Sequence, residues 1–160
     1  MPNWVRNIVS VQNEKAIQET LSKENGRDLF DFQKIIPMPE ELDESSDRYI
    51  KNLSIEEKLL FIKETGGIDN WYDWCVKNWD TKWNAAETVV LSNKKVMFDT
   101  AWSAPFNIFK ELSKKYHTKV KVRYADEGIT ENSGTIIYED GVEIDYKEGD
   151  RRFCNRVWSA

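Results

Sequence analysis

Short stretches of alternating hydrophobic and polar residues recur along the chain, and this period of two predicts β-strands. The stretches are 4–11, 86–91, 96–102, 120–124, 134–138 and 142–146. Ser92-Asn93-Lys94-Lys95 separates two of them, and Asn93 suits a turn, so these two strands form a predicted hairpin. The last two strands flank Asp140-Gly141, which favours a tight hairpin turn in the same way.

Apolar residues at spacings of three and four predict four helices between these strands. The helices are 13–25, 54–65, 71–78 and 106–116. Asn13 and Asn70 can each cap the start of a helix, and Ser54 with Glu57 forms a capping box. Asn25-Gly26 would end the first helix. After the final hairpin, Phe153, Val157 and Trp158 are expected to pack onto the body of the fold.

The order of the elements predicts the fold class. Without residues 27–84, the order is strand, helix, strand, strand, helix, strand, which is the split β-α-β arrangement of ferredoxin-like folds. We therefore expect one α+β domain over 1–160, with a helical insertion at about 27–84 and an extra C-terminal β-hairpin. The alternative is an α+β sandwich with another strand order, since order cannot be read from propensity.

Composition narrows the class of partner. The 160 residues carry a formal net charge of -5, which disfavours general nucleic-acid binding but leaves room for a local basic patch. Cys75 and Cys154 lie far apart and in no paired motif, as is typical of reduced cytoplasmic thiols. No apolar run has the roughly 18 residues of a membrane span, and the N-terminus lacks the layout of a signal peptide. A cytoplasmic protein without membrane contact is expected.

Tryptophan is concentrated in one part of the chain, where five of the seven Trp residues fall between positions 71 and 102. The candidate ligand or partner-binding residues there are Trp79, Asp80, Lys82, Trp83, Asp99 and Trp102. In one interpretation the indole rings and the Lys82 ammonium hold a planar anionic ligand such as a nucleotide. In the other, the rings are packing residues and Lys82 pairs with Asp99 or Asp80.

An acidic segment near the C-terminus is a second candidate surface. Its residues are Glu139, Asp140, Glu143 and Asp145, which could meet a basic partner or form a solvated face. Binding of RNA through strand aromatics would have to use Phe98 and Tyr124, without a ribonucleoprotein motif. His117, the single histidine, lies at a predicted helix end with no nucleophile in a local motif. No catalytic residue, metal site or cofactor is predicted.

Four segments of the chain have a distinctive sequence. They are Met1-Pro2-Asn3-Trp4, Phe30-Asp31-Phe32 with Ile35-Ile36-Pro37-Met38-Pro39, Asn78-Trp79-Asp80-Thr81-Lys82-Trp83-Asn84, and Phe98-Asp99-Thr100-Ala101-Trp102-Ser103-Ala104-Pro105. In this order they resemble the YubB ferredoxin-like family, whose members are carried by bacteriophages and conjugative plasmids. Three positions depart from the family pattern. Val5 replaces a frequent Cys, Asp80 a usual Gly and Ala104 a usual Pro, so a thiol role is doubtful and the loop at Asp80 has less backbone freedom.

The resemblance implies a ferredoxin-like fold and a mobile-element origin, and it implies no reaction. The resulting hypothesis is a non-enzymatic interaction protein that binds a host or defence-system protein, such as a counter-defence inhibitor of the anti-CRISPR type. The alternative is a small-ligand or nucleotide-binding protein, or an enzyme, that uses the Trp-lined pocket.

Overall fold

The computed structural model describes residues 2–42, 53–68, 70–129 and 131–160. Its strands are β1 (Trp4–Val11), β2 (Leu21–Glu24), β3 (Arg27–Phe30), β4 (Ala86–Ser92), β5 (Lys95–Ala101), β6 (Lys119–Asp126), β7 (Ser133–Glu139) and β8 (Val142–Glu148). Its α-helices are α1 (Lys15–Gln18), α3 (Ile55–Thr65), α4 (Trp71–Trp79), α5 (Phe106–Lys115) and α6 (Arg151–Trp158). Two short 3-10 helices, Phe32–Lys34 and Glu40–Leu42, follow β3.

Six strands form one sheet in the order β4-β5-β1-β6-β7-β8, and all neighbours are antiparallel. The central strand β1 lies between β5 and β6, and β4 lies outside β5. This is the strand order of a split β-α-β fold, in which the third and fourth strands flank the first. The predicted ferredoxin-like α+β class is therefore confirmed, and β7 with β8 extends the sheet as the predicted hairpin.

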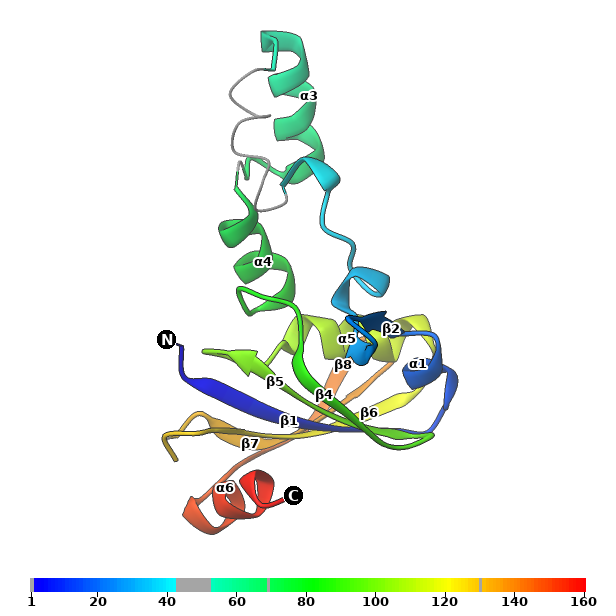
Figure 1. Cartoon of the computed structure of the whole chain (residues 1–160), viewed down its shortest axis with the longest axis vertical. Coiled ribbons are helices and arrows are strands. Elements are labelled where there is room, and N and C mark those ends of the chain that lie inside the picture. Colours follow the sequence, from blue (N-terminus) through cyan, green and yellow to red (C-terminus); the bar gives the residue numbers. More distant parts are fainter. Residues whose placement is uncertain (1, 43–52, 69, 130) are drawn as a thin grey trace.

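The main core lies between the sheet and α5. Alternate residues of β1, β5 and β6 point to this face, and Phe98 is packed between Phe30 and Phe109. Helix α6 packs on the other face of the sheet, where Cys154 and Val157 are buried against Ile8. Figure 1 shows α5 and α6 on opposite sides of the sheet. The expected packing of the C-terminal segment is thus confirmed.

The prediction of one long helix over 13–25 is wrong. Helix α1 ends at Gln18, and the chain then forms the β2–β3 hairpin. Asn25 and Gly26 both have positive φ, 51° and 78°, as the two central residues of a type I′ turn require. Asn-Gly is the strongest short hairpin signal, and here it outweighs the helical spacing of the residues before it.

Helices α3 and α4 form an arm that projects from the sheet, with α4 near the sheet and α3 at the far end (Figure 1). The predicted caps are present, since the side chains of Ser54 and Asn70 accept hydrogen bonds from the N–H groups of Glu57 and Asp73. The arm lies within the predicted insertion, residues 27–84, of which 43–52 and 69 are outside the described residues. That range opens with a strand, β3, and the first α-helix of its described residues, α3, begins directly after the predicted cap Ser54.

Candidate functional site

The end of α4 is anchored to the start of α5. Asp80 follows α4 with a φ of 63°, in the left-handed region that favours glycine. Its Oδ2 accepts a hydrogen bond from the N–H of Asn107 at 2.8 Å, and the Asn107 side chain donates to the carbonyl of Asn78 at 2.7 Å. Burial raises the pKa of the Asp80 carboxyl, and the Asn107 N–H partly opposes this rise. Asp80 therefore fixes the loop that follows α4 relative to the sheet.

The segment after β5 is held from two sides. The Thr81 hydroxyl donates to the carbonyl of Ala101 at 2.7 Å. Trp102 has a φ of 69°, its N–H donates to the Asn3 carbonyl, and its own carbonyl accepts from the Asn132 side chain. A bulky residue at such a φ is an outlier that persists only where its surroundings impose it. The Trp102 side chain is nevertheless 53% exposed, so its position does not serve burial in the core.

These two segments enclose a cavity of about 240 Å³ between α4 and the end of β5. Its lining residues are Tyr72, Val76, Asp80, Thr81, Lys82, Ala101, Trp102 and Ser103. Three of the six predicted site residues, Asp80, Lys82 and Trp102, thus come together. Tyr72 and Val76 were missed, although they stand four residues apart on the side of α4 turned away from Trp74 and Cys75.

Lys82 supplies the positive charge at this cavity. Its Nζ lies 3.9 Å from the centroid of the Trp83 ring, a cation–π contact, and Trp83 in turn lies against Trp4 with ring centroids 6.1 Å apart. Among the residues the structure describes, no ion pair joins Lys82 to a carboxylate. The predicted pairing of Lys82 with Asp99 or Asp80 is therefore not present, and the ammonium is available to an anionic group.

Trp79 is a core residue and does not line the cavity. It is 2% exposed, its ring packs edge-on against Phe32 and Trp74, and its Nε1 donates to the carbonyl of Ile36 at 2.9 Å. The ring faces are covered, so the prediction that Trp79 stacks on a ligand is wrong. The packing interpretation holds for this residue.

Asp99 lies on the opposite face of the sheet, because it alternates with the core residue Phe98 along β5. Its carboxylate accepts from the guanidinium of Arg6, Oδ1 from Nε at 2.9 Å and Oδ2 from Nη2 at 3.2 Å. Arg6 also lies over the ring of Trp158, with Cζ 4.3 Å from its centroid. The placement of Asp99 in the ligand pocket is thus wrong, and its role is to join β1 and β5 to α6.

The four acidic candidates are distributed around the β7–β8 hairpin. The register shifts at this point, so Glu143 pairs with Tyr138 and Asp145 with Ile137, neighbouring residues that point to opposite faces of the sheet. Glu139 and Asp140 are exposed at the hairpin turn. His117 Nδ1 lies 3.4 Å from Asp140 Oδ1 with both side chains exposed, so this contact is a surface one. The hairpin does not present its carboxylates as one continuous face.

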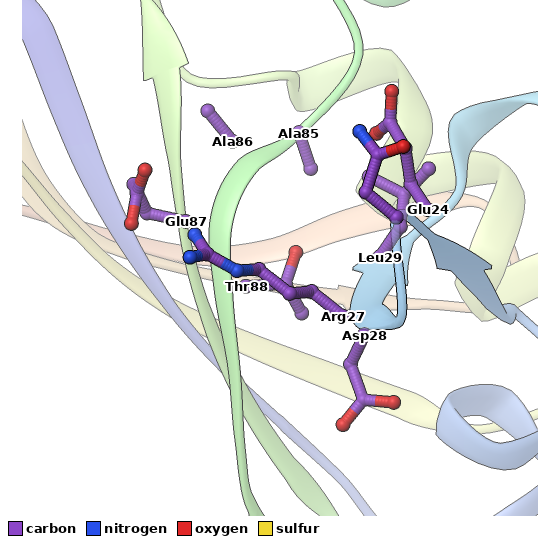
Figure 2. Close-up of a pocket in the computed structure, with 9 residues that line it drawn as sticks. Glu24, Arg27, Asp28, Leu29, Ala85, Ala86, Glu87 and Thr88 are labelled. Atoms are coloured by element: carbon purple, nitrogen blue, oxygen red, sulfur yellow. The ribbon is translucent and has the colours of Figure 1, made fainter.

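A second cavity, of about 550 Å³, separates the β2–β3 hairpin from the edge strand β4. Its lining residues are Glu24, Asn25, Arg27, Asp28, Leu29, Ala85, Ala86, Glu87 and Thr88. Figure 2 shows Arg27 extended toward Glu87 while Asp28 points away from the space. Glu87 has a φ of 50°, and the strand register shifts between Ala86 and Val89. Charges of both signs line this open space, and they define no single ligand chemistry.

No membrane-spanning helix occurs in the described ranges, where every helix is too short or too polar for one. The same part of the chain contains no cluster of three His, Cys, Asp or Glu residues suited to a metal ion.

Comparison with known proteins shows the family to which the chain belongs. The crystal structure of a protein Api92 from Yersinia pseudotuberculosis is similar over 52% of this chain and 31% of that chain, with 17% sequence identity and a TM-score of 0.43. The present chain thus matches about a third of that protein's length. None of the curated proteins matches the sequence. Residues 78–158, slightly more than half of the chain, match the family model described as the ferredoxin-like domain in Api92-like protein. The chain therefore belongs to the family of Api92-like proteins with a ferredoxin-like domain.

Proposed function

We propose that this chain is a non-enzymatic protein-binding protein whose contact surface is centred on the cavity beside Trp102. The observation that carries the proposal is the state of Trp102, a half-exposed indole on a strained backbone that three neighbouring segments hold in place. Strain of this kind clusters at functional sites, and exposed Trp and Tyr dominate the energetics of protein interfaces.

The size of the cavity favours a protein partner over a nucleotide. Small-molecule sites usually enclose about 300–1,000 Å³, and the present cavity of about 240 Å³ is smaller. Trp79 offers no ring for base stacking, because it is buried. One apolar side chain of a partner fits between Tyr72, Val76 and Trp102, and a neighbouring carboxylate of that partner would meet the ammonium of Lys82.

The arm adds a second apolar region. Ile55, Leu59 and Ile62 recur at helical spacing along α3 and are 79%, 62% and 48% exposed. Single exposed apolar residues are ordinary, but a helix that exposes a stripe of them away from the core is typical of an interaction element. We infer that α3 contributes to the same partner contact or to a second one.

The class of partner follows from the resemblance to the YubB family stated above. Members of that family are carried by bacteriophages and conjugative plasmids, and such elements encode small proteins that bind host proteins. We propose a mobile-element origin, action in the host cytoplasm, and a host or defence-system protein as the partner. A counter-defence inhibitor of the anti-CRISPR type is the most specific form of this hypothesis.

The test is affinity capture of the tagged chain from cells that contain active defence systems, read by mass spectrometry. Trp102→Ala and Lys82→Ala are the site variants, and Lys23→Ala, on the exposed side of the β2–β3 hairpin, is the control. A stoichiometric partner that Trp102→Ala loses and Lys23→Ala keeps supports the proposal. A blank capture contradicts it. Thermal stabilisation of the chain by a nucleotide, lost in Lys82→Ala, would then favour the small-ligand alternative.

A further inference from the structure

The face of the sheet that carries α6 is only partly covered. Helix α6 packs on Ile8, Met97 and Ala125, and its last turn is fixed by a hydrogen bond from Trp158 Nε1 to the Ala125 carbonyl. Beyond Ile8, toward the end of β1, the next residue on this face is Ser10. This part of the face extends across β5, β1 and β6 without a covering helix in the described chain.

Cations line this uncovered part. Ser10 pairs with Lys95 on one side and with Lys121 on the other, so the three residues form a row across three strands. Directly opposed residues in an antiparallel sheet lie about 4.5–5.5 Å apart between Cα atoms, which is short relative to a lysine side chain. Both ammonium groups can therefore reach an anion placed above the Ser10 hydroxyl.

A cavity of about 290 Å³ lies beside α6, next to a neighbouring row on the same face in which Arg123 is opposite Thr135 and Thr135 is opposite Lys147. Its lining residues are Arg123, Thr135, Lys147, Glu148, Gly149, Asp150, Phe153 and Arg156. Arg123 follows Lys121 by two residues on β6 and so lies on the same face, about 7 Å further along the strand. The carboxylate of Asp150 caps α6, because its Oδ1 accepts a hydrogen bond from the Phe153 N–H. That hydrogen bond lowers the pKa of the Asp150 carboxyl.

None of these cations forms an ion pair within the part of the chain that the structure describes. The cations are Lys95, Lys121, Arg123, Lys147 and Arg156. Of the acidic residues on this face, Asp99 is neutralised by Arg6 beneath α6, and Glu139 and Asp145 lie toward the outer edge, on β7 and β8. Glu148 and Asp150 line the cavity together with the cations there, so the row formed by Lys95, Ser10 and Lys121 is the part of the face without a carboxylate. A chain with a net charge of -5 thus keeps its middle strands cationic on one face.

We propose that this face binds the phosphate backbone of single-stranded nucleic acid, with one phosphate above Ser10 and another in the cavity between Arg123 and Arg156. Phe98 and Tyr124 are buried on the other face, so base stacking on the strand aromatics that the sequence offered is excluded. Recognition then rests on charge and is independent of base sequence. A single strand is favoured because it can follow the floor of the sheet into the cavity beside α6, whereas a stiff duplex cannot.

This proposal uses none of the residues around Trp102, so it stands or fails separately from the protein-binding proposal. The test is fluorescence anisotropy of a labelled single-stranded DNA oligonucleotide and of its duplex, titrated with the full chain at several salt concentrations. The site variant is Lys95→Ala with Lys121→Ala. The control is Lys58→Ala with Lys63→Ala, two exposed lysines of α3, which changes the net charge equally.

With about four phosphate contacts, the logarithm of the binding constant should fall with the logarithm of salt concentration with a slope of about -3. Binding should then weaken about 50-fold between ~50 and ~200 mM salt. The site variant should reduce the magnitude of this slope by about 1.4, and the control should leave it unchanged. Absence of binding at low salt, equal weakening by the control, or tighter binding of the duplex would each overturn the proposal, provided thermal melting shows folded variants.

Discussion

Replacement of Trp79 by Ala separates its assigned role in the core from a role at a surface. The side chain is 2% exposed, and a buried Trp removes about 150–250 Å² from water. At about 25 cal/mol per Å² this burial stabilises the fold by about 4–6 kcal/mol, and measured Trp→Ala substitutions in cores cost about 3–5 kcal/mol. The Ile36 carbonyl would also lose its donor, at a cost of about 1 kcal/mol.

We therefore expect Trp79→Ala to lower the free energy of unfolding by about 4–5 kcal/mol, a large fraction of the ~5–15 kcal/mol of a typical domain. The measurement is equilibrium unfolding in guanidinium chloride, with the midpoint and the slope fitted together. Trp102→Ala is the matched control, since its side chain is 53% exposed and should cost less than about 1 kcal/mol. A loss below about 1 kcal/mol for Trp79→Ala would refute the core assignment.

Three further predictions concern the Arg6–Asp99 pair, the buried carboxyl of Asp80 and the turn of the β2–β3 hairpin. Asp99→Ala should lower the free energy of unfolding in urea by about 2–3 kcal/mol, because it leaves the half-buried Arg6 guanidinium without its partner. In the double variant, Arg6→Ala should cost less than it costs alone, and fully additive costs would contradict the pairing. Burial raises the pKa of Asp80, so the protonated carboxyl contributes its full stabilisation of the fold below about pH 3.9, and this stabilisation is lost as the pH rises through the folded-state pKa. Asp80→Asn should therefore become more stable relative to the native chain as the pH rises. A difference in the free energy of unfolding that stays constant with pH would contradict this direction. Gly26→Val should destabilise the β2–β3 hairpin by about 1–2 kcal/mol, read by thermal melting, since Val disfavours a φ of 78°. The control is Glu24→Val at an exposed position of β2, which should cost less than about 0.5 kcal/mol; an equal loss for both variants would contradict the role of the turn.

The sequence determined the sheet well because its strands carry clear local signals. Both hairpins of the main sheet, 86–102 and 133–148, have apolar alternation and a recognisable turn, and the predicted boundaries lie within a few residues of those observed. The strand order could not be read locally, because it depends on which edges β1 offers to β5 and β6. The ferredoxin-like fold class was predicted from the order of helices and strands along the chain, and another strand order remained as an alternative until the structure showed the pairing of β1 with β5 and β6.

The site was harder to predict because proximity in sequence does not decide the face of a strand. Asp99 and Trp102 are three residues apart, yet Asp99 pairs with Arg6 beneath α6 and Trp102 lines the cavity beside α4. Trp79 and Lys82 are also three residues apart, and the left-handed turn at Asp80 places one in the core and the other at the cavity. These outcomes depend on register and on backbone turns that side-chain chemistry does not reveal.

The α3 stripe and the cationic face illustrate a second limit. Apolar residues at the spacing of Ile55, Leu59 and Ile62 usually form the buried face of a helix, but in Figure 1 the arm carries α3 away from the core and these side chains are exposed. Net charge likewise describes the whole chain, and the row formed by Lys95, Ser10 and Lys121 exists only because three strands place them in register. Features assembled from distant segments are visible only in the folded structure.

The proposal that Trp102 lies at the centre of a protein-binding surface is tested most directly by the affinity of a captured, purified partner for the native chain and for Trp102→Ala, measured by calorimetry. An indole at the centre of an interface usually contributes about 2 kcal/mol or more, so we expect at least about 30-fold weaker binding of Trp102→Ala, with nearly unchanged thermal stability. Equal affinity for the two chains would contradict it and would place the contact surface elsewhere, with the exposed stripe of α3 as the next candidate.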